Sequence, residues 1–154
     1  MDGVFLKKDG TPPTQEDKRI LFNVMYGGRL DGLGNGDYLT TDDGWNFRGR
    51  GLKQLTGRDN YTNFNTWHAA NQTRWHDDII DAINHPETLL DMKYATRSAA
   101  WFWIRNNGKM AKKANKGNKD AIVNEVTGII NSDTDSYEAR RKNFKKLWNE
   151  ERFG

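Results

Sequence analysis

The stretch DGWNFRGRGLKQLTGRDNY, from Asp43 to Tyr61, decides how this sequence is interpreted. Its centre is Gly49-Arg50-Gly51, and two glycines around an arginine allow the backbone to turn tightly and to approach another surface closely. An amide, a hydroxyl, a guanidinium and an aromatic ring follow within about ten positions. This set suits a ligand rich in hydroxyls and amides, such as an amino-sugar polymer. The alternative interpretation is a polar loop that only leads into a helix.

The same stretch resembles the central motif of glycoside hydrolase family 19, the chitinases and endolysins of phages and bacteria. That motif has the form G-[WY]-x-[FY]-x-G-R-G-x-x-Q-[LI]-[TS]-G and lines the substrate cleft. Further segments resemble the family in the same order, and the resemblance covers Phe22 to Trp148. These segments are Asn23 to Leu30 with Gly34-Asn35-Gly36, Ala99 to Trp103, and Ile129-Ile130-Asn131. The resemblance implies a mainly α, lysozyme-like fold, with at most a small β-hairpin near Trp45 to Leu55.

The resemblance also implies an activity and a set of site residues. Members of the family hydrolyse β-1,4-linked amino sugars by inverting general acid–base catalysis, which implies peptidoglycan or chitin as the substrate. Thr56 matches a hydroxyl that positions the attacking water, while Gln54 and Asn60 match amides that contact the sugar. Asn131 matches a cleft asparagine, although Ser132-Asp133 replaces the family's glycines after it. The remaining implied positions are Arg140, behind the acid, and Tyr26 and Trp45, which are either stacking surfaces or core.

The catalytic acid of the family does not have a clear counterpart in this sequence. Family members carry a glutamate in an H-E-[ST] motif upstream of the segment that resembles this chain, and no His-Glu pair occurs here. Glu16 is the one glutamate before the Gly-Arg-Gly motif. It falls among helix-start residues, where an acidic side chain favours the helix dipole, and we favour that role over a catalytic one. Asp37, Asp42 and Asp43 are the next candidates.

Two classes of function therefore stay open. The chain is either a cell-wall glycan hydrolase of the endolysin or chitinase type, or a catalytically impaired sugar-binding domain. We expect a single family 19-like domain over residues 1–154 that lacks its N-terminal part, with residues 1–13 flexible. The missing glutamates would then lie on an upstream fragment or a partner chain.

Composition excludes several other functions. The chain has no cysteine, and its three histidines are spread without metal-ligand spacing, so we expect neither a metal nor a cofactor. The formal net charge is +3, and the basic stretch from Lys109 to Lys119 contains no aromatic residue. Because single-stranded nucleic acids are bound through aromatic stacking beside basic side chains, we expect no nucleic-acid partner.

The sequence contains neither a signal peptide nor a membrane span. No segment approaches the ~20 consecutive apolar residues that a span requires, and Met1 to Gly10 holds no apolar signal core. We therefore expect synthesis in the cytoplasm and action at the bacterial cell wall, in the periplasm, after release by a holin or a secretion system.

Hydrophobic periodicity predicts six helices, and aromatic residues are expected to fill much of their core. Trp101, Phe102 and Trp103 are adjacent in the most apolar predicted helix. Because neighbouring helix positions point in different directions, we expect at least two of these rings to be buried. The predicted helices are Thr14 to Met25, Arg58 to Asn71, Asp77 to Ile83, Lys93 to Asn106, Asn118 to Ile130 and Asp133 to Glu150.

Overall fold

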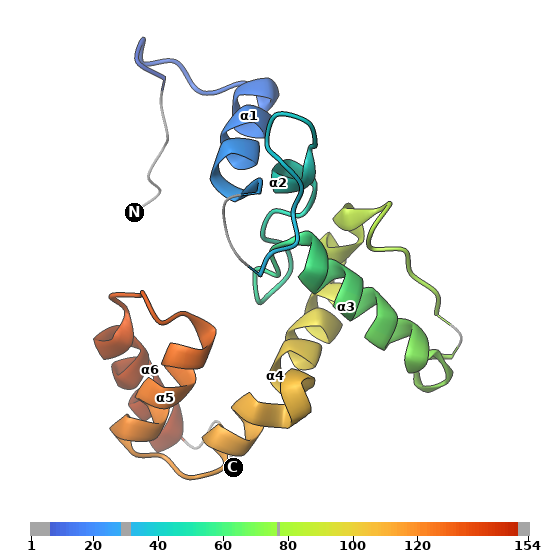
Figure 1. Ribbon diagram of the computed structural model, residues 1–154. Coiled ribbons are helices and arrows are strands. Elements are labelled where there is room, and N and C mark those ends of the chain that lie inside the picture. The colour runs from blue at the N-terminus through green and yellow to red at the C-terminus, as the bar shows by residue number, and fades with distance from the viewer. Residues whose placement is uncertain (1–6, 29–31, 77, 151–154) are drawn as a thin grey trace. The chain divides into compact units, whose positions relative to one another are not determined.

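The structure is a computed structural model that describes residues 7–28, 32–76 and 78–150 (Figure 1). It is 61% helix and 1% strand, which confirms the mainly α class and is consistent with a lysozyme-like helical domain. The strand content is one isolated antiparallel bridge, between Arg50 and Leu55, within the region of the predicted hairpin. No helix of the described residues is long and apolar enough to cross a membrane.

The chain divides into two compact units, Met1–Trp101 and Phe102–Gly154. Each unit is described by itself, and the single-domain organisation stays a prediction. Of the segment expected to be flexible, residues 1–6 lie outside the described residues. Residues 7–13 form a turn and a stretch without regular secondary structure. Lys7 of this segment pairs at 3.1 Å with Asp17, which lies in the helix that follows.

In the first unit, helix α1 spans Gln15–Tyr26 and begins at the predicted position. The Thr14 hydroxyl accepts from the Asp17 N–H, and the Asp17 carboxylate accepts from the Thr14 N–H, which is a capping box. The other elements follow along the chain, and α1 and α2 lie side by side (Figure 1). They are α2 (Asp43–Asn46), α3 (Arg58–Ala70), the 3₁₀ helices η1 (Gln72–Trp75) and η2 (Pro86–Leu90), and the first part of α4 (Met92–Ala114).

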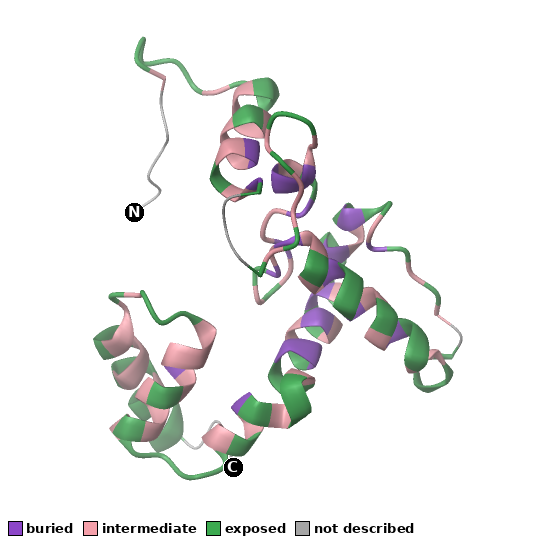
Figure 2. Ribbon diagram, viewed as in Figure 1, coloured by how far each residue is buried: buried purple, intermediate pink, exposed green. Residues whose placement is uncertain are grey.

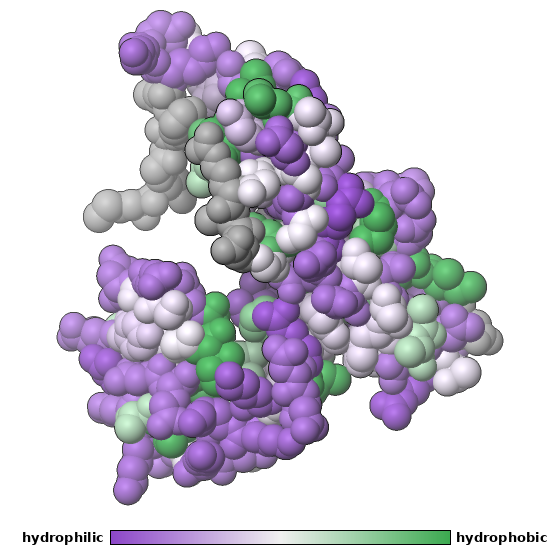
Figure 3. Space-filling model, viewed as in Figure 1, coloured by the Kyte–Doolittle hydropathy of each residue, from purple (hydrophilic) through white to green (hydrophobic). Residues whose placement is uncertain are grey.

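The core of the first unit is aromatic, as the composition suggests. Phe64 on α3 is fully buried, and its ring centroid lies 5.9 Å from that of Trp101 on α4. Tyr61, one turn earlier, packs edge-on against Phe47 at 5.2 Å. Buried residues accordingly gather along α3 and the first part of α4 (Figure 2), whereas the face shown in Figure 3 is mostly hydrophilic.

His68 belongs to this core. It is fully buried, its Nε2 lies 2.9 Å from the Arg97 guanidinium, and its ring is stacked on Trp75. Arg97 in turn pairs with Asp78 at 2.6 Å. Burial and the Arg97 charge lower the pKa of His68, which favours the neutral imidazole. His68 therefore links α3 to α4 as a packed core residue.

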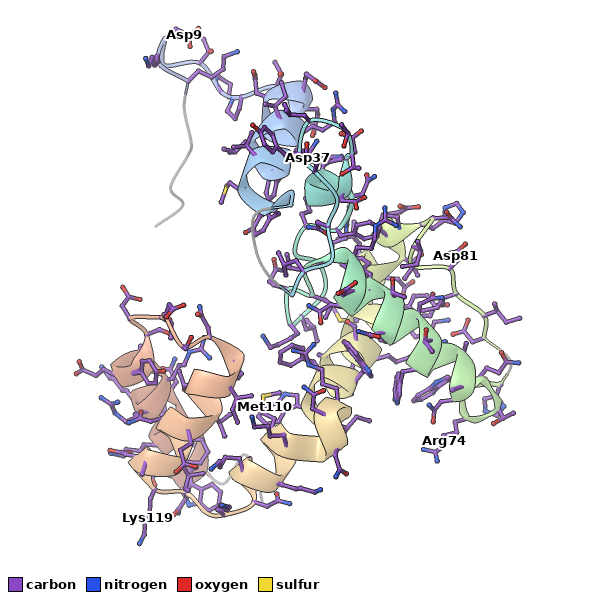
Figure 4. All side chains as sticks on the ribbon, in the orientation of Figure 1. Asp9, Asp37, Arg74, Asp81, Met110 and Lys119 are labelled. Carbon is purple, nitrogen blue, oxygen red and sulfur yellow. The ribbon has the colours of Figure 1, made fainter. Side chains whose placement is uncertain are left out.

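The second unit contains the remainder of α4, then α5 (Asp120–Ile130) and α6 (Tyr137–Asn149), which pack against each other. The prediction of a helix from Lys93 to Asn106 is close at both ends, because the backbone leaves helical geometry from Arg105 to Gly108, but it lacks the helix that resumes up to Ala114. Asn106, Asn107 and Gly108 take left-handed angles there, and these are the residue types that tolerate them best. Met110 resumes the buried face after this break and lines a hollow with residues of α5 (Figure 4).

Two further expectations have different outcomes in the structure. No helix forms over the described part of Asp77 to Ile83, residues 78–83, because Asp81 turns the chain by accepting from the N–H groups of Ile83 and Asn84. Such a side-chain acceptor competes with helical hydrogen bonding. Trp101 and Phe102 are buried as expected, while Trp103 is 37% exposed. The expectation that two of the three rings are core is thus confirmed.

Candidate functional site

The stretch from Asp43 to Tyr61 is attached to α1 through a buried asparagine. Asn23 Nδ2 donates to Asp42 Oδ1 at 2.7 Å, and Asn23 Oδ1 accepts from the Trp45 N–H at 2.8 Å. Both ends of the amide are therefore satisfied inside the protein. Gly44 is required beside it, because a Cβ there would lie 2.4 Å from the Phe22 carbonyl oxygen. Asn23 thus fixes the position of α2, from which the turn begins.

An ion pair between a buried carboxylate and a partly exposed guanidinium joins the same stretch to the start of α3. The Asp43 side chain is 5% exposed and accepts from the Arg58 guanidinium and, at 2.8 Å, from the Gly36 N–H. Burial would raise the pKa of Asp43, but the hydrogen bonds from Arg58 and Gly36, with the Arg58 charge, hold that pKa below its usual value. Asn35 adds a second link, since its side chain accepts from the Arg58 N–H and donates to the Tyr26 carbonyl oxygen, both at 2.8 Å.

The turn itself is closed around Arg50. Arg50 and Leu55 exchange backbone hydrogen bonds of 3.2 and 2.8 Å, and the Arg50 side chain is buried. Its guanidinium donates to the Asn46 carbonyl oxygen and to the Tyr61 hydroxyl, which in turn donates to the Arg48 carbonyl oxygen. The arginine of the Gly-Arg-Gly motif therefore organises the turn from within and does not reach outward for a ligand.

Three residues predicted to contact or position substrate lie together on the outside of this turn. Thr56 Oγ1 donates to the Gln54 carbonyl oxygen at 2.9 Å, and Asn60 Nδ2 donates to the Thr56 carbonyl oxygen at 2.7 Å. Gln54 is exposed, with a left-handed φ of 55°, and its Nε2 donates to the Gly51 carbonyl oxygen at 3.1 Å. The Thr56 hydroxyl uses its proton within the turn, so toward a ligand or a water it acts as an acceptor.

Gly49 provides the space that these side chains use. A Cβ at Gly49 would lie 2.8 Å from Gln54 Oε1 and 3.2 Å from Thr56 Oγ1. Both polar atoms therefore face the backbone of Gly49, and a larger residue would displace them. On the other side, a Cβ at Gly51 would approach Ala95 and Ser98 of α4 at 3.2 Å, so the turn packs directly on the core helix.

Glu16 has the environment of a structural carboxylate. Both of its oxygens accept from Arg19, at 2.8 and 2.9 Å, and Arg19 also donates to both oxygens of Asp42. The hydrogen bond from Arg19 is the largest cause that lowers the pKa of Glu16. A general acid near neutral pH needs the opposite shift. This geometry favours the helix-start interpretation over the catalytic one.

The two aromatic candidates pack with a third ring. Tyr26 is stacked on Phe22 at 5.9 Å, and Trp45 meets the edge of Phe22 at 5.8 Å. The Arg48 guanidinium lies 3.6 Å from the centre of the Trp45 ring and covers one of its faces. Both Tyr26 and Trp45 remain half-buried. Sugar stacking by either residue stays a prediction.

Asn131 and Arg140 belong to the second unit. Asn131 ends α5, where its N–H donates to the Thr127 carbonyl oxygen and its Oδ1 accepts from the Asp133 N–H at 3.2 Å. Arg140 Nε donates to Ser136 Oγ at 2.9 Å. The structure therefore gives their local roles, and their place in a substrate cleft stays a prediction.

A hollow of about 450 Å³ lies between α1 and the loop that precedes α2. The Arg19–Asp42 pair and Asn23 form its polar wall, and Ile20 and Leu39 form its apolar wall. Figure 4 places Asp37 in the same loop. Gln54, Thr56 and Asn60 do not line this hollow. Among residues 7–28, 32–76 and 78–150, no three His, Asp or Glu side chains gather as metal ligands.

Sequence reasoning did not anticipate the partners that hold the site. Arg58 was noted only as a polar group after the turn, and Asp43 only as a possible acid, yet they form the ion pair at its base. The available signal was the position of each residue. Asp43 precedes a glycine in the first turn of a short helix, and Arg58 opens the next helix. The spacing of residues along the sequence did not predict which side chain pairs with Asp43.

These features describe a helical protein with a rigid, polar turn that carries an amide–hydroxyl–amide group. The chain is similar to a "Glycosyl hydrolase family 19 domain-containing protein" of Haemophilus influenzae, with 29% identity over 112 residues. The matched part is 73% of this chain and 46% of that protein, so the chain spans about half the length of the curated relative. No family model matches the chain. The relative supports the resemblance to glycoside hydrolase family 19.

Proposed function

We propose that this chain is a glycan-recognising domain of the family 19 type, which binds β-1,4-linked amino sugars of peptidoglycan or chitin. The observation that carries the proposal is the group formed by Gln54, Thr56 and Asn60 on a turn held by the Asp43–Arg58 ion pair and by hydrogen bonds. Amides and a hydroxyl provide the donors and acceptors that acetamido and hydroxyl groups need. In a bacterial setting the site of action would be the cell wall.

In the inverting reaction, a carboxylic acid protonates the leaving glycosidic oxygen while a carboxylate activates water on the opposite face of the sugar ring. The proposed role of Thr56 is to accept a hydrogen bond from that water and so to hold it. Gln54 and Asn60 would hold the sugar beside it. None of these three side chains can supply the acid or the base.

The nominated carboxylates are poorly suited to be the acid. The pKa values of Glu16 and Asp43 are lowered by Arg19 and Arg58 respectively, so both side chains are anions at neutral pH. Asp42 accepts from Arg19 and Asn23, and Asp37 accepts from the Leu39 N–H. We therefore propose that the 154-residue chain binds amino-sugar oligomers but hydrolyses them slowly or not at all. A general acid on another polypeptide segment would restore about 10²–10⁴-fold in rate.

A turbidity assay tests whether the chain hydrolyses glycan slowly or not at all. Purified peptidoglycan is incubated with the chain and with its Glu16→Gln and Thr56→Ala variants, and light scattering is followed. We expect no more than marginal clearing by any of the three proteins, and an active lysozyme serves as the positive control for the substrate.

Strong clearing by the wild-type chain would contradict the proposal. If Glu16→Gln abolished that clearing, Glu16 would be the general acid despite its pairing with Arg19. If only Thr56→Ala abolished it, the chain would contain an acid other than Glu16, and single substitutions of Asp37, Asp42 and Asp43 would locate it.

A further inference from the structure

The second unit contains a hollow of about 520 Å³ between the beginning of α5 and the end of α6. We call it the α5–α6 hollow. Residues from both helices line it, and Lys119, labelled in Figure 4, marks the end at which α5 begins. None of the residues implied by the family resemblance belongs to this lining. The hollow therefore has no role in the function proposed above.

An aromatic surface forms one wall of the α5–α6 hollow. Trp148 stacks on Phe144 with ring centroids 5.6 Å apart and an interplanar angle of 28°. Trp148 is nonetheless 47% exposed. Phe144 thus supports the indole from one side while much of the ring stays accessible. An exposed, supported indole is a suitable surface for the apolar face of a pyranose ring, because its rigid ring offers a large contact area at low entropic cost.

A carboxylate and two amides lie around the same hollow. Asp120 Oδ2 accepts from Lys145 Nζ at 2.8 Å, which fixes the orientation of the carboxylate. Asp120 Oδ1 is buried, whereas the Asp120 side chain as a whole is 47% exposed. The accessible oxygen is therefore Oδ2, which can accept a further hydrogen bond. Asn118 precedes α5 and Asn149 ends α6, and both are exposed. Each amide offers a donor and an acceptor, the combination that an N-acetyl group and ring hydroxyls require.

We propose that the α5–α6 hollow binds one N-acetylated amino-sugar residue of a glycan, stacked on Trp148 and hydrogen-bonded by Asn118, Asn149 and Asp120. The ligand class rests on the proposed function, whereas the site is a separate one. Lys119 and Lys145 also line the hollow, so a simple anion is the competing occupant, but it would meet the Asp120 carboxylate, with which Lys145 is already paired. A second site on one chain increases retention on a polymer beyond the affinity for a short oligomer.

The proposal is tested with the full chain labelled with ¹⁵N and titrated with the β-1,4-linked tetramer of N-acetylglucosamine. The signals followed are the Trp148 indole N–H and the side-chain amides of Asn118 and Asn149, assigned from single substitutions. We expect these signals to shift and saturate together. In Trp148→Ala the affinity measured from the two amides falls about tenfold or more. Trp103→Ala, which removes an exposed indole elsewhere, leaves the shifts unchanged.

The backbone signals of Gly49 and Thr56 report on the other site in the same spectra. If these shift while the Trp148, Asn118 and Asn149 signals do not, the second site is overturned and the proposed function stands. If the Trp148 group shifts alone, the second site stands and the function proposed for the turn fails. Asn149→Ala provides a second test in case Trp148→Ala unfolds, and an unchanged affinity in this variant overturns the proposal. The chain is also titrated with inorganic phosphate, and equal shifts of the same signals with phosphate overturn the proposal as well.

Discussion

Replacing Arg58 by methionine is expected to lower the free energy of unfolding by about 1–3 kcal/mol at neutral pH, because the Asp43 carboxylate is buried while water screens the 42% exposed Arg58 side chain. The substitution leaves the Asp43 carboxylate, which is 5% exposed, with the Gly36 N–H but without its cationic partner. An ionised group that is buried without a counter-charge is costly, whereas a pair replaced by neutral residues is often tolerated. Urea unfolding followed by tryptophan fluorescence measures the loss.

The pH dependence of this effect has a definite sign. In the wild type the folded pKa of Asp43 is lowered, so its stabilisation is present above the unfolded pKa of about 3.9 and is lost as the pH falls below it. In Arg58→Met burial prevails and raises that pKa, so the deficit relative to the wild type shrinks as the pH falls toward 4. The double variant Asp43→Asn/Arg58→Met is the control and should recover much of the loss. A deficit that is equally large at pH 4 and pH 7 would contradict this explanation.

Replacing Phe102 by alanine is expected to cost about 3–5 kcal/mol in the free energy of unfolding. Phe102 is 8% exposed, and the Arg105 guanidinium lies 3.8 Å from the centre of its ring. Truncation removes buried apolar surface, leaves a cavity and removes the ring on which the Arg105 guanidinium packs. The variant also tests the second unit, whose core contains few large apolar residues.

Trp103→Ala is the matched control, because Trp103 is the next residue of the same helix and is 37% exposed. Its substitution should cost clearly less than that of Phe102, since a partly exposed ring loses less buried area. Thermal unfolding monitored by circular dichroism compares the two variants. A loss below about 1 kcal/mol for Phe102→Ala would show that this ring is not part of a core.

Much of the helical fold was readable from the sequence, because its signals are local. Thr14 and Asp17 mark the start of α1 as a capping pair, and the apolar spacing of α5 gave both of its ends within one or two residues. The predicted end of the helix, Asn106, lies within the break in α4, whereas the helix that resumes up to Ala114 was missed, because the basic stretch from Lys109 offers few apolar residues to mark a helix face. What ends the regular helix is an Asn-Asn-Gly run that takes left-handed angles.

Only the residues on the outside of the turn were predictable from the sequence. Gln54, Thr56 and Asn60 lie within seven positions of one another, so a turn followed by a helix brings them together. Their support is non-local, because Asp43 is held by Arg58 and Gly36, and Trp45 is held by Asn23 of α1. These pairings depend on how three segments cross, which spacing along one segment does not encode. The α5–α6 hollow was missed for the same reason.

Calorimetric titration tests whether the turn carrying Thr56 recognises amino-sugar polymers. The tetramer of N-acetylglucosamine and a soluble peptidoglycan fragment are each titrated into the wild type, Thr56→Ala, Gln54→Ala and the control Thr66→Ala, a substitution at an exposed position of α3. We expect the wild type and the control to bind at least one of these ligands. We expect both turn variants to bind with less heat than the wild type, with their fold unchanged. Equal binding by all four proteins, or no binding of either ligand by the wild type, would show that the turn does not recognise amino sugars.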